Sequence, residues 1–316
     1  MVVCIEEERK ASKRIADQIK NCDKELYDML VRKYIIDVEE PSVYAPKEFI
    51  HDKYDIHEEL QVGASSVVHR GLRVCDGLPV AVKTVYKEDI QLWKYIKERR
   101  IPMEIYILKQ VSYLKDSVTL LDYYENLNEW LIVMKKPEKC TDLLDFIDKC
   151  EYSLEPETHA KKFLYQITSG LVELESVGVV HQDIKLENIV IDTDKKSALI
   201  VDFDRALMIK ESKVYGFPCS RRIAPPELIK YGWYFSAPLQ VWQLGVMLYH
   251  MVMGVEPFKS DDEILKCELK FNTDVSSECQ DLIKACLNPY FPSRATYEQI
   301  LNHPWIKNEE FHKFDY

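Results

Sequence analysis

The stretch VVHQDIKLENIVID, residues 179–192, decides the fold of this chain. Within eight positions it places a histidine, two acids, a lysine and an asparagine, namely His181, Asp183, Glu187, Lys185 and Asn188. The apolar pairs Val179–Val180 and Ile189–Val190 border this polar segment on both sides. Because such pairs have the residue types of short strands, we expect them to form a short hairpin that holds the polar loop.

The residue types in this loop suit phosphoryl transfer, which needs bound phosphates, metal ions and a carboxylate that orients the acceptor hydroxyl. Asp183 can accept the hydroxyl proton, and Lys185 can neutralise charge on the transferred phosphate. Asn188 supplies an oxygen that suits a hard cation. Asp202, in the stretch LIVDFD (199–204), offers a second acid at the end of another apolar run.

A lysine inside an expected strand points to the same chemistry. VAVK (80–83) places Lys83 where an unpaired buried ammonium would be costly. Glu104, in the helical segment 101–111, is its natural partner. With the PPE at 225–227, these elements follow the order of the protein-kinase signature set. One polar turn of this kind arises by chance, but five ordered elements do not.

The order of strand-like and helical segments predicts an α+β, bilobal layout, with a small β-rich N-lobe that has one main helix and a larger, mostly α-helical C-lobe. Together with the signature set, this layout indicates a protein-kinase fold. Strand-like segments rich in β-branched and aromatic residues are 54–62, 66–74, 79–86, 118–126 and 129–136. Helical segments are 101–111, 142–150, 158–178, 238–252, 276–287 and 296–303. The expected kinase domain is 54–306, divided into an N-lobe (54–134), a hinge (135–141) and a C-lobe (142–306).

The ends of the chain lie outside that domain. Residues 1–46 form an extension whose apolar positions make one helix stripe, at Ile15, Ile19, Cys22, Leu26 and Leu30. EEPSVYAP (39–46) has two prolines and is expected to be a linker. The stripe either packs on the main domain or docks a partner. Residues 307–316 form a short tail.

Composition excludes several classes of function. The net charge of −11 over 316 residues argues against nucleic acid or an anionic membrane as partner and suits basic peptides, although solubility alone also explains it. The longest apolar stretch, 241–255, is too short to span a bilayer and contains Gln243 and His250. Nine cysteines without a CxxC pair indicate free thiols in a reducing compartment, the cytoplasm or nucleus.

The chain resembles the Pim family of serine/threonine kinases, within the calmodulin-dependent kinase group, as a divergent member. Further segments that carry the likeness are 87–93, 101–111, 135–147, 275–283 and 302–306. The hinge is the most telling, because Pro137 stands where other kinases use a backbone N–H to hold adenine, and proline has none.

The resemblance implies a role for each matching residue, with ATP and Mg²⁺ as cofactors. Lys83 would hold the α- and β-phosphates and pair with Glu104, Asp183 would be the catalytic acid–base residue with Lys185 beside it, and Asn188 and Asp202 would ligate magnesium. The nucleotide site would consist of Val62, Gly63, Val68, Ala81, Lys83, Met134 (the gatekeeper), Lys135 through its carbonyl, and Val190. Basic peptides would meet Asp142, Asp145 and Glu187, although the first two also suit a solvated helix start. Glu227 and Arg294 would form a structural ion pair.

Several departures from the kinase pattern put catalysis in question. The loop expected to cover the phosphates has Gln61, Gly63 and Ser66 at its three glycine positions, so we expect a stiffer loop with weaker phosphate contact. The metal-binding DFG is DFD, and Asp204 adds negative charge unless it points toward Arg205. HRD is HQD, and Gln182 cannot pair with an activation-loop phosphate. Cys219-Ser220 replaces the usual Gly-Thr, and Gln240 replaces an Asp that the Pim family also lacks.

Three hypotheses remain open. The intact set of polar residues predicts an active Ser/Thr kinase for basic protein substrates, independent of activation-loop phosphorylation. The lost glycines favour instead a pseudokinase that binds partners, with the N-terminal helix as docking device. An atypical nucleotide transferase on the same fold is the third, because fold alone does not fix function.

Overall fold

The computed structural model describes residues 47–63, 66–96, 99–114, 117–148, 156–209, 213–216 and 218–307. The expected N-terminal extension (1–46) and all of the tail after Lys307 lie outside these residues. So do Ala64 and Ser65 of the phosphate-covering loop and parts of the activation segment. The residues expected to bind nucleotide, metal and substrate all lie within the described ranges.

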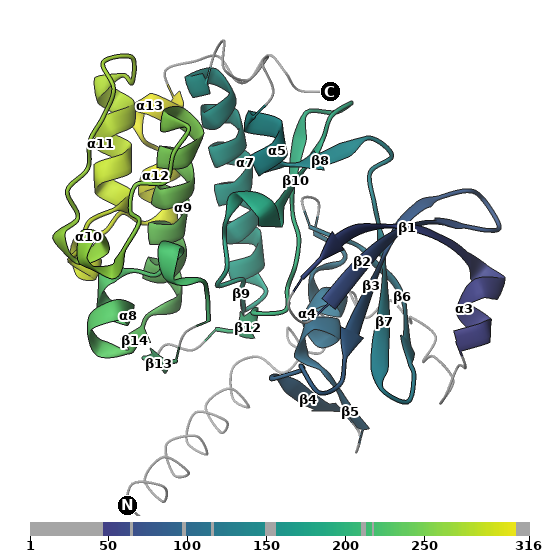
Figure 1. The fold of residues 1–316 in the computed structure, drawn as a ribbon. Helices are drawn as coiled ribbons and strands as arrows, with labels where there is room; N and C mark the ends of the chain where they lie inside the picture. The colour runs from purple at the N-terminus through teal and green to yellow at the C-terminus, as the bar shows by residue number, and fades with distance from the viewer. Residues whose placement is uncertain are drawn as a thin grey trace, which may run out of the picture. The chain divides into compact units, whose positions relative to one another are not determined.

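The N-terminal half of the kinase domain is built on a five-stranded antiparallel sheet (Figure 1). Its strands, in spatial order, are β1 (Tyr54–Val62), β2 (Ser66–Arg73), β3 (Pro79–Tyr86), β7 (Glu129–Lys135) and β6 (Leu120–Glu125). All five lie in segments whose β-branched and aromatic residues predicted strands. A short helix, α3 (Lys47–Lys53), precedes β1 and packs against it.

The main helix of this half, α4 (Met103–Val111), follows a two-stranded hairpin of β4 (Trp93–Ile96) and β5 (Arg99–Pro102). The helix begins two residues later than expected, because Ile101 and Pro102 complete β5 and pair with Lys94 and Trp93. Four apolar residues of α4 and Glu104 are buried. The helix therefore presents one carboxylate to the interior, close to the sheet.

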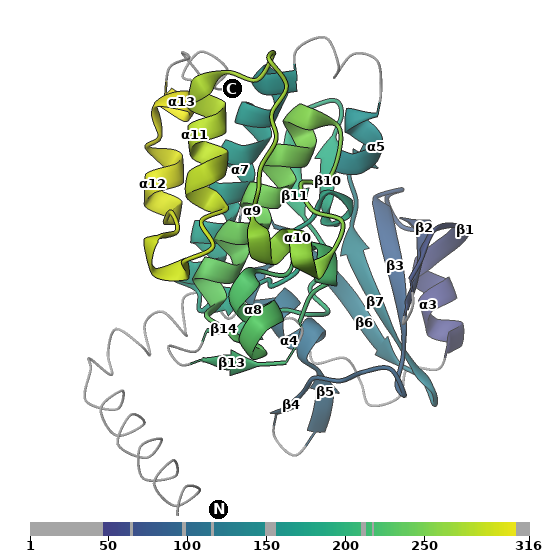
Figure 2. The same cartoon turned by 60° about the vertical axis from the view of Figure 1, so that its left-hand side comes forward.

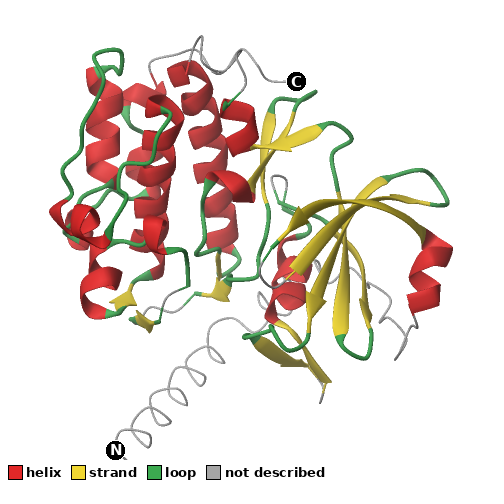
Figure 3. Cartoon of the chain, in the orientation of Figure 1, coloured by secondary structure: helices red, strands yellow, loops and turns green. Residues whose placement is uncertain are grey.

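The C-terminal half is mostly helical (Figures 2 and 3). Its α-helices are α5 (Leu143–Ile147), α7 (Pro156–Ser176), α8 (Pro226–Tyr231), α9 (Ser236–Met253), α10 (Asp261–Lys266), α11 (Ser277–Cys286), α12 (Tyr297–Leu301) and α13 (Pro304–Lys307). Short 3₁₀ turns are η1 (Leu186–Asn188), η2 (Arg221–Ile223) and η3 (Phe291–Ser293). The fold class is thus the expected α+β arrangement.

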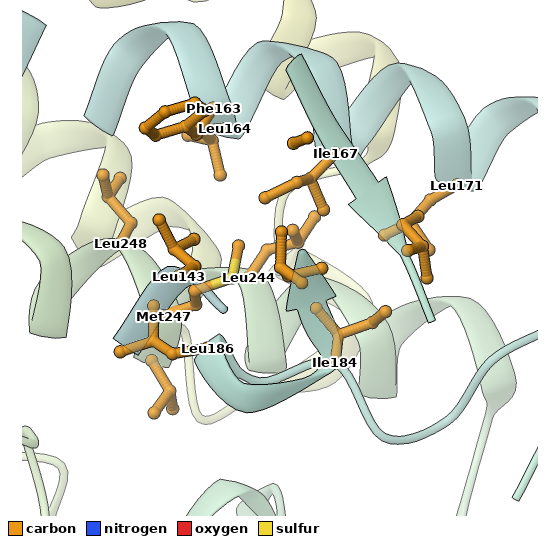
Figure 4. Packing of buried hydrophobic residues seen from close by; sticks show 14 of the residues in the cluster. Leu143, Phe163, Leu164, Ile167, Leu171, Ile184, Leu186, Leu244, Met247 and Leu248 are labelled. Atoms are coloured by element: carbon orange, nitrogen blue, oxygen red, sulfur yellow. The ribbon is translucent and has the colours of Figure 1, made fainter. Parts of the chain in front are cut away.

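Helix α9 is the centre of this half. It packs against α7 and α11 and is buried on almost all sides, as its nearly continuous apolar sequence predicts. Among the described helices, none joins enough length to enough apolar character to cross a membrane. The apolar side chains of α9 meet those of α7 and of the loop after β9 in one core, shown in Figure 4.

The short strands around residues 179–192 correct one prediction. Val179–Val180 (β9) and Ile189–Asp192 (β10) do not pair with each other. β9 pairs with β12 (Leu207–Met208), whereas β10 lies between β8 (Cys140–Asp142) and β11 (Ser197–Ile200). The expected hairpin was wrong because strands this short take their partners from tertiary packing. A last pair, β13 (Val214–Tyr215) and β14 (Trp233–Tyr234), joins the activation segment to the start of α9.

Candidate active site

The loop between β9 and β10 is anchored by its apolar residues. Ile184 and Leu186 are buried in the core of the helical half, in the same cluster as Leu143, Leu244 and Met247, and Figure 4 shows all five. They alternate with Lys185, which is partly exposed, and Glu187, which is exposed. Through this alternation the core sets the position of the loop.

Asp183 keeps one carboxylate oxygen without a partner. Its Oδ2 accepts a hydrogen bond from Asn188 Nδ2 at 3.2 Å and lies 3.4 Å from Lys185 Nζ. Its Oδ1 is buried and has no hydrogen-bond partner among the described residues. A buried carboxylate oxygen without a partner is rare, and a catalytic role is one explanation for it.

Lys83 joins the two halves of the domain. Its Nζ lies 2.6 Å from Glu104 Oε1 in α4 and 2.6 Å from Asp202 Oδ1, which follows β11. Burial disfavours the charged ammonium, but the two carboxylates outweigh it and raise the pKa of Lys83 above its ordinary value. The pair of Lys83 with Glu104, expected from the sequence, is therefore formed.

His181 connects the loop to the stretch that contains Asp202. Its ring Nε2 lies 2.9 Å from the Val201 carbonyl, its Nδ1 lies 3.4 Å from the Asp183 amide, and its ring packs edge-on against Phe203 at 4.9 Å. The Val201 carbonyl can only accept, so the network assigns the proton to Nε2. Burial lowers the pKa of His181, which keeps the ring neutral. The histidine is thus a structural link.

One face of the five-stranded sheet carries the residues expected to contact the nucleotide. Val68 lies opposite Lys83 on β2, and Met134 lies opposite Ala81 on β7. Since opposed residues and residues two apart share a face, Val68, Ala81, Lys83 and Met134 lie on the same side. The three apolar ones are partly exposed. The face offers an apolar surface beside a fixed ammonium. Val190 belongs to another sheet, on β10.

The hinge begins at Lys135, which is exposed at the end of β7. The Lys135 amide donates to Thr119 at 2.9 Å, and the Lys136 amide donates to Pro79 at 3.0 Å. Pro137 follows and has no N–H to offer. Losing one hydrogen bond to a base weakens binding by about 0.5–1.5 kcal/mol.

One backbone amide of the phosphate-covering loop is hydrogen-bonded within the loop itself. The Gly63 N–H donates to the Ser66 carbonyl at 2.8 Å, and Val62 pairs with Val67 across the hairpin. Val62 and Gly63 are both exposed. The Gly63 amide is therefore not free for phosphate in this conformation.

The oxygen donors available to a metal are those of a nucleotide-bound magnesium site. Asn188 directs its Nδ2 to Asp183, so its Oδ1 points away from that bond. Burial raises the pKa of Asp202, but the Lys83 ammonium outweighs burial and holds this pKa below its usual range, so the carboxylate is ionised. Within the described residues no cluster of three His, Cys, Asp or Glu side chains forms a self-sufficient metal site. One carboxylate and one amide fit magnesium that keeps waters and takes its other ligands from phosphates.

Asp204, which replaces the glycine of DFG, lies partly exposed with its Oδ2 at 3.4 Å from Arg205 Nε. The neutralising contact that the sequence allowed is therefore present. Burial and the neighbouring Asp202 carboxylate nevertheless raise the pKa of Asp204. The residue adds an unfavourable negative charge beside the expected metal ligand.

The three acids expected to meet basic peptides have different surroundings. Asp142 caps the N-terminus of α5, where its Oδ1 accepts the Asp145 amide at 2.8 Å. Asp145 and Glu187 are exposed. Asp142 thus has a structural task of its own, whereas the other two carboxylates face solvent.

The activation segment is held by arginines. Arg221 pairs with Asp261 in α10, and Arg222 Nη1 lies 3.0 Å from Glu256. Ser220 is exposed just before η2, while burial, with the nearby Asp183 carboxylate, raises the pKa of the Cys219 thiol to about 12. The thiol is therefore protonated and close to the catalytic loop.

Two glutamines of α9 are hydrogen-bonded to the backbone of the loop between β9 and β10. The Gln240 carbonyl oxygen accepts the amides of His181 at 2.5 Å and Gln182 at 3.1 Å. Gln240 thus supplies the acceptor that the missing aspartate would have given. Gln243, which also bonds this loop, was missed by sequence reasoning. Its position in an otherwise apolar helix could have revealed this role, because a buried amide must have hydrogen-bond partners.

Comparison with known proteins agrees with this geometry. The model of the protein kinase domain matches residues 54–306. Serine/threonine-protein kinase pim-2 of Danio rerio is 37% identical over 270 residues, which cover 82% of this chain and 86% of that protein. Serine/threonine-protein kinase prk-2 of Caenorhabditis elegans is 36% identical over 81% of this chain and 58% of its own length. Serine/threonine-protein kinase PSK1 of Saccharomyces cerevisiae is 32% identical over 72% of this chain and 17% of its own length.

The match of the domain model covers most of the chain, and the fold and the order of polar residues agree with it. The likeness to pim-2 extends over most of both proteins. The chain therefore belongs to the protein kinase family, as a divergent Pim-like serine/threonine kinase.

Proposed function

We propose that this kinase binds ATP with magnesium and transfers the γ-phosphate to Ser or Thr of basic protein substrates, without activation-loop phosphorylation. The observation that carries the proposal is the pairing of Lys83 with Glu104 and with Asp202, each at 2.6 Å. These ion pairs preserve the lysine–glutamate contact that phosphoryl transfer by protein kinases requires.

The residues of the site fit ATP and magnesium. The apolar face formed by Val68, Ala81 and Met134 would receive adenine, and Lys83 would bind the α- and β-phosphates. Asn188 and Asp202 would hold magnesium, which neutralises charge on the phosphates when bound. Asp183 would accept the hydroxyl proton, with Lys185 beside it.

The activation segment supports independence from phosphorylation. Gln182 is neutral and fully buried, so it offers no cation to a phosphate. The ion pairs of Arg221 with Asp261 and of Arg222 with Glu256 already tie the segment to the helical half. Protein treated with phosphatase, and shown unmodified by mass spectrometry, should retain its kcat. A tenfold loss on dephosphorylation would contradict this part of the proposal.

Charge supports a basic substrate. The chain has a net charge of −11, and Asp145 and Glu187 present exposed carboxylates. Asp142 is the weaker candidate, because one of its oxygens caps α5. A peptide with arginines before its serine should therefore be phosphorylated at much lower concentration than its counterpart with glutamates.

A pseudokinase scaffold is the second candidate, and two observations favour it. The Gly63 amide is engaged by Ser66 within the phosphate-covering loop. Asp204 adds a carboxylate beside Asp202. Both features weaken phosphate binding without removing a catalytic group. In that case the chain would bind partners, and the N-terminal extension, outside the described residues, would be the docking device.

The first experiment is thermal unfolding with ATP, with and without magnesium, for wild type and Lys83→Met. At a hundred times its Kd a ligand adds about 2.7 kcal/mol, which raises Tm by roughly 5–11 °C in a domain of this size. We expect this shift only with magnesium, and its loss in Lys83→Met. Lys87→Met, which removes an ion pair with Glu125 just beyond β3, is the matched control and should keep the shift.

The second experiment separates the two candidates. Phosphate transfer from ATP to the basic peptide is measured for wild type and Asp183→Asn, and the variant should lose about 10²–10⁴-fold in kcat. The variant should still show the thermal shift with ATP. Nucleotide binding without any transfer by wild type would favour the pseudokinase, and absence of both would favour a scaffold that does not use nucleotide.

A further inference from the structure

The catalytic loop rests on two glutamines that lie one helical turn apart on α9. Gln240 and Gln243 are both buried, at 1% and 0% exposure. The Gln240 amide nitrogen donates to the Tyr297 hydroxyl of α12, so that this side chain is held from behind. Both amides therefore have defined orientations in the core.

Gln243 forms hydrogen bonds to the backbone on each side of Asp183. Its Oε1 accepts the Ile184 amide at 3.0 Å, and its Nε2 donates to the Gln182 carbonyl at 2.7 Å. The two peptide groups that flank the Asp183 residue are thus fixed by one planar side chain. A carboxylate at this position would accept the first bond but could not donate the second.

The loop needs such a support because its conformation is unfavourable. Gln182 has a φ of 71°, the left-handed region that costs a non-glycine residue on the order of 1–2 kcal/mol. Bonds from both glutamines act on this residue: Gln240 accepts its amide and Gln243 donates to its carbonyl. Strain of this kind persists only where the surroundings over-determine it.

The same amide also reaches the activation segment. The Gln243 amide opposes the rise in the pKa of the Cys219 thiol, which precedes Ser220, and so lies near that thiol. Gln243 is therefore bonded to the loop that carries Asp183 and lies near the segment that borders it. In this chain no arginine stands at position 182 to make such a link through a phosphate.

We propose that Gln243 is a positioning residue for phosphoryl transfer: its amide orients the peptide groups on both sides of Asp183 and thereby aims the Asp183 carboxylate. The inference rests on the role proposed for Asp183. Gln243 touches neither substrate nor nucleotide in this scheme, so its effect should fall on turnover and not on nucleotide affinity.

The test compares Gln243→Leu with Gln166→Leu. Gln166 is a half-buried glutamine of α7 that accepts one backbone amide, that of Ala198, at 2.8 Å. We expect Gln243→Leu to lower kcat by about 10–100-fold, as misplacement of a catalytic group does, while KM for ATP changes less than twofold. Gln166→Leu should reduce stability and leave kcat within twofold of wild type.

A second variant, Gln243→Glu, keeps the shape and restores the donor only when protonated. Burial raises the pKa of an introduced carboxyl. Its kcat relative to wild type should therefore rise as the pH is lowered from about 9 to about 6. A residue that merely fills space would give a ratio independent of pH. If Gln243→Leu does not fold, this ratio decides the question.

Amide hydrogen exchange of the peptide covering residues 181–184 gives a readout that needs no activity. It should be faster in Gln243→Leu than in wild type and unchanged in Gln166→Leu. Unchanged exchange, an unchanged kcat, or a loss confined to KM for ATP would each overturn the inference. A wild-type protein without transfer activity would instead refute the proposed function, while the exchange experiment would still show whether Gln243 orders the loop.

Discussion

Arg294→Met should destabilise this kinase more than any exposed charge substitution. Arg294 Nη1 and Nη2 bind the two oxygens of Glu227 at 2.8 and 2.9 Å, and the side chains are 1% and 3% exposed. Two further bonds go to the carbonyls of Pro238 and Asn288, at 2.8 and 3.0 Å. Removing the arginine leaves Glu227 charged, buried and unpaired, which costs about 3–5 kcal/mol.

For a domain of this size that loss lowers Tm by roughly 6–20 °C. Urea unfolding of wild type and Arg294→Met measures it directly. Arg222→Met is the matched control, because Arg222 pairs with Glu256 at 3.0 Å but is 69% exposed, so its loss should cost at most about 1 kcal/mol. The double variant Glu227→Met, Arg294→Met should recover most of the stability, since no charge is left buried. A single Arg294→Met variant within about 1 kcal/mol of wild type would refute the reasoning.

Three other predictions concern the site. The pKa of Asp204 is raised in the folded chain, so between its unfolded and folded pKa values the folded protein binds more protons than the unfolded one, and stability falls as the pH rises through this window. Above the window Asp204→Asn should therefore be more stable than wild type, and in acid this gain should disappear. A difference in urea midpoint that does not vary between about pH 4 and 8 would contradict this. Gln61→Gly with Ser66→Gly should lower KM for ATP severalfold, because glycine lets the loop backbone approach phosphate; an unchanged or higher KM would show that the loop is not limiting. Asp145→Asn with Glu187→Gln should raise KM for an arginine-rich peptide about 3–30-fold, by roughly 1 kcal/mol for each exposed pair lost, and should leave KM for ATP unchanged; equal effects on both constants would speak against a substrate-binding role.

Long patterns in the sequence predicted the elements that they cover. The β-branched runs of 79–86 and 129–135 form β3 and β7, and the apolar run around 241–255 falls largely within α9. The short elements were harder to predict from the sequence. Val179–Val180 finds its partner in Leu207–Met208, far along the chain, and two residues carry too little pattern to reveal that pairing. Local spacing could not distinguish this from a hairpin.

The candidate site divides in the same way. The identity of Lys83, Glu104 and Asp202 could be predicted, because each residue type has a chemical task and a fixed order in the chain. The hydrogen bonds of Gln243 to the loop could not be predicted, because they depend on how a helix far along the sequence packs against the residues that flank Asp183. Neither residue spacing nor composition records that approach.

The shared position of Lys83 between Glu104 and Asp202 has a thermodynamic consequence. If Asp202 ligates magnesium as proposed, the metal competes with the ammonium for the charge of this carboxylate, and the weakened ion pair leaves Lys83 freer to bind phosphate. Each ligand then lowers the free energy required to bind the other, and the coupling is reciprocal. Titrations should accordingly find that the apparent affinity for ATP depends on magnesium and the apparent affinity for magnesium on ATP, by the same factor.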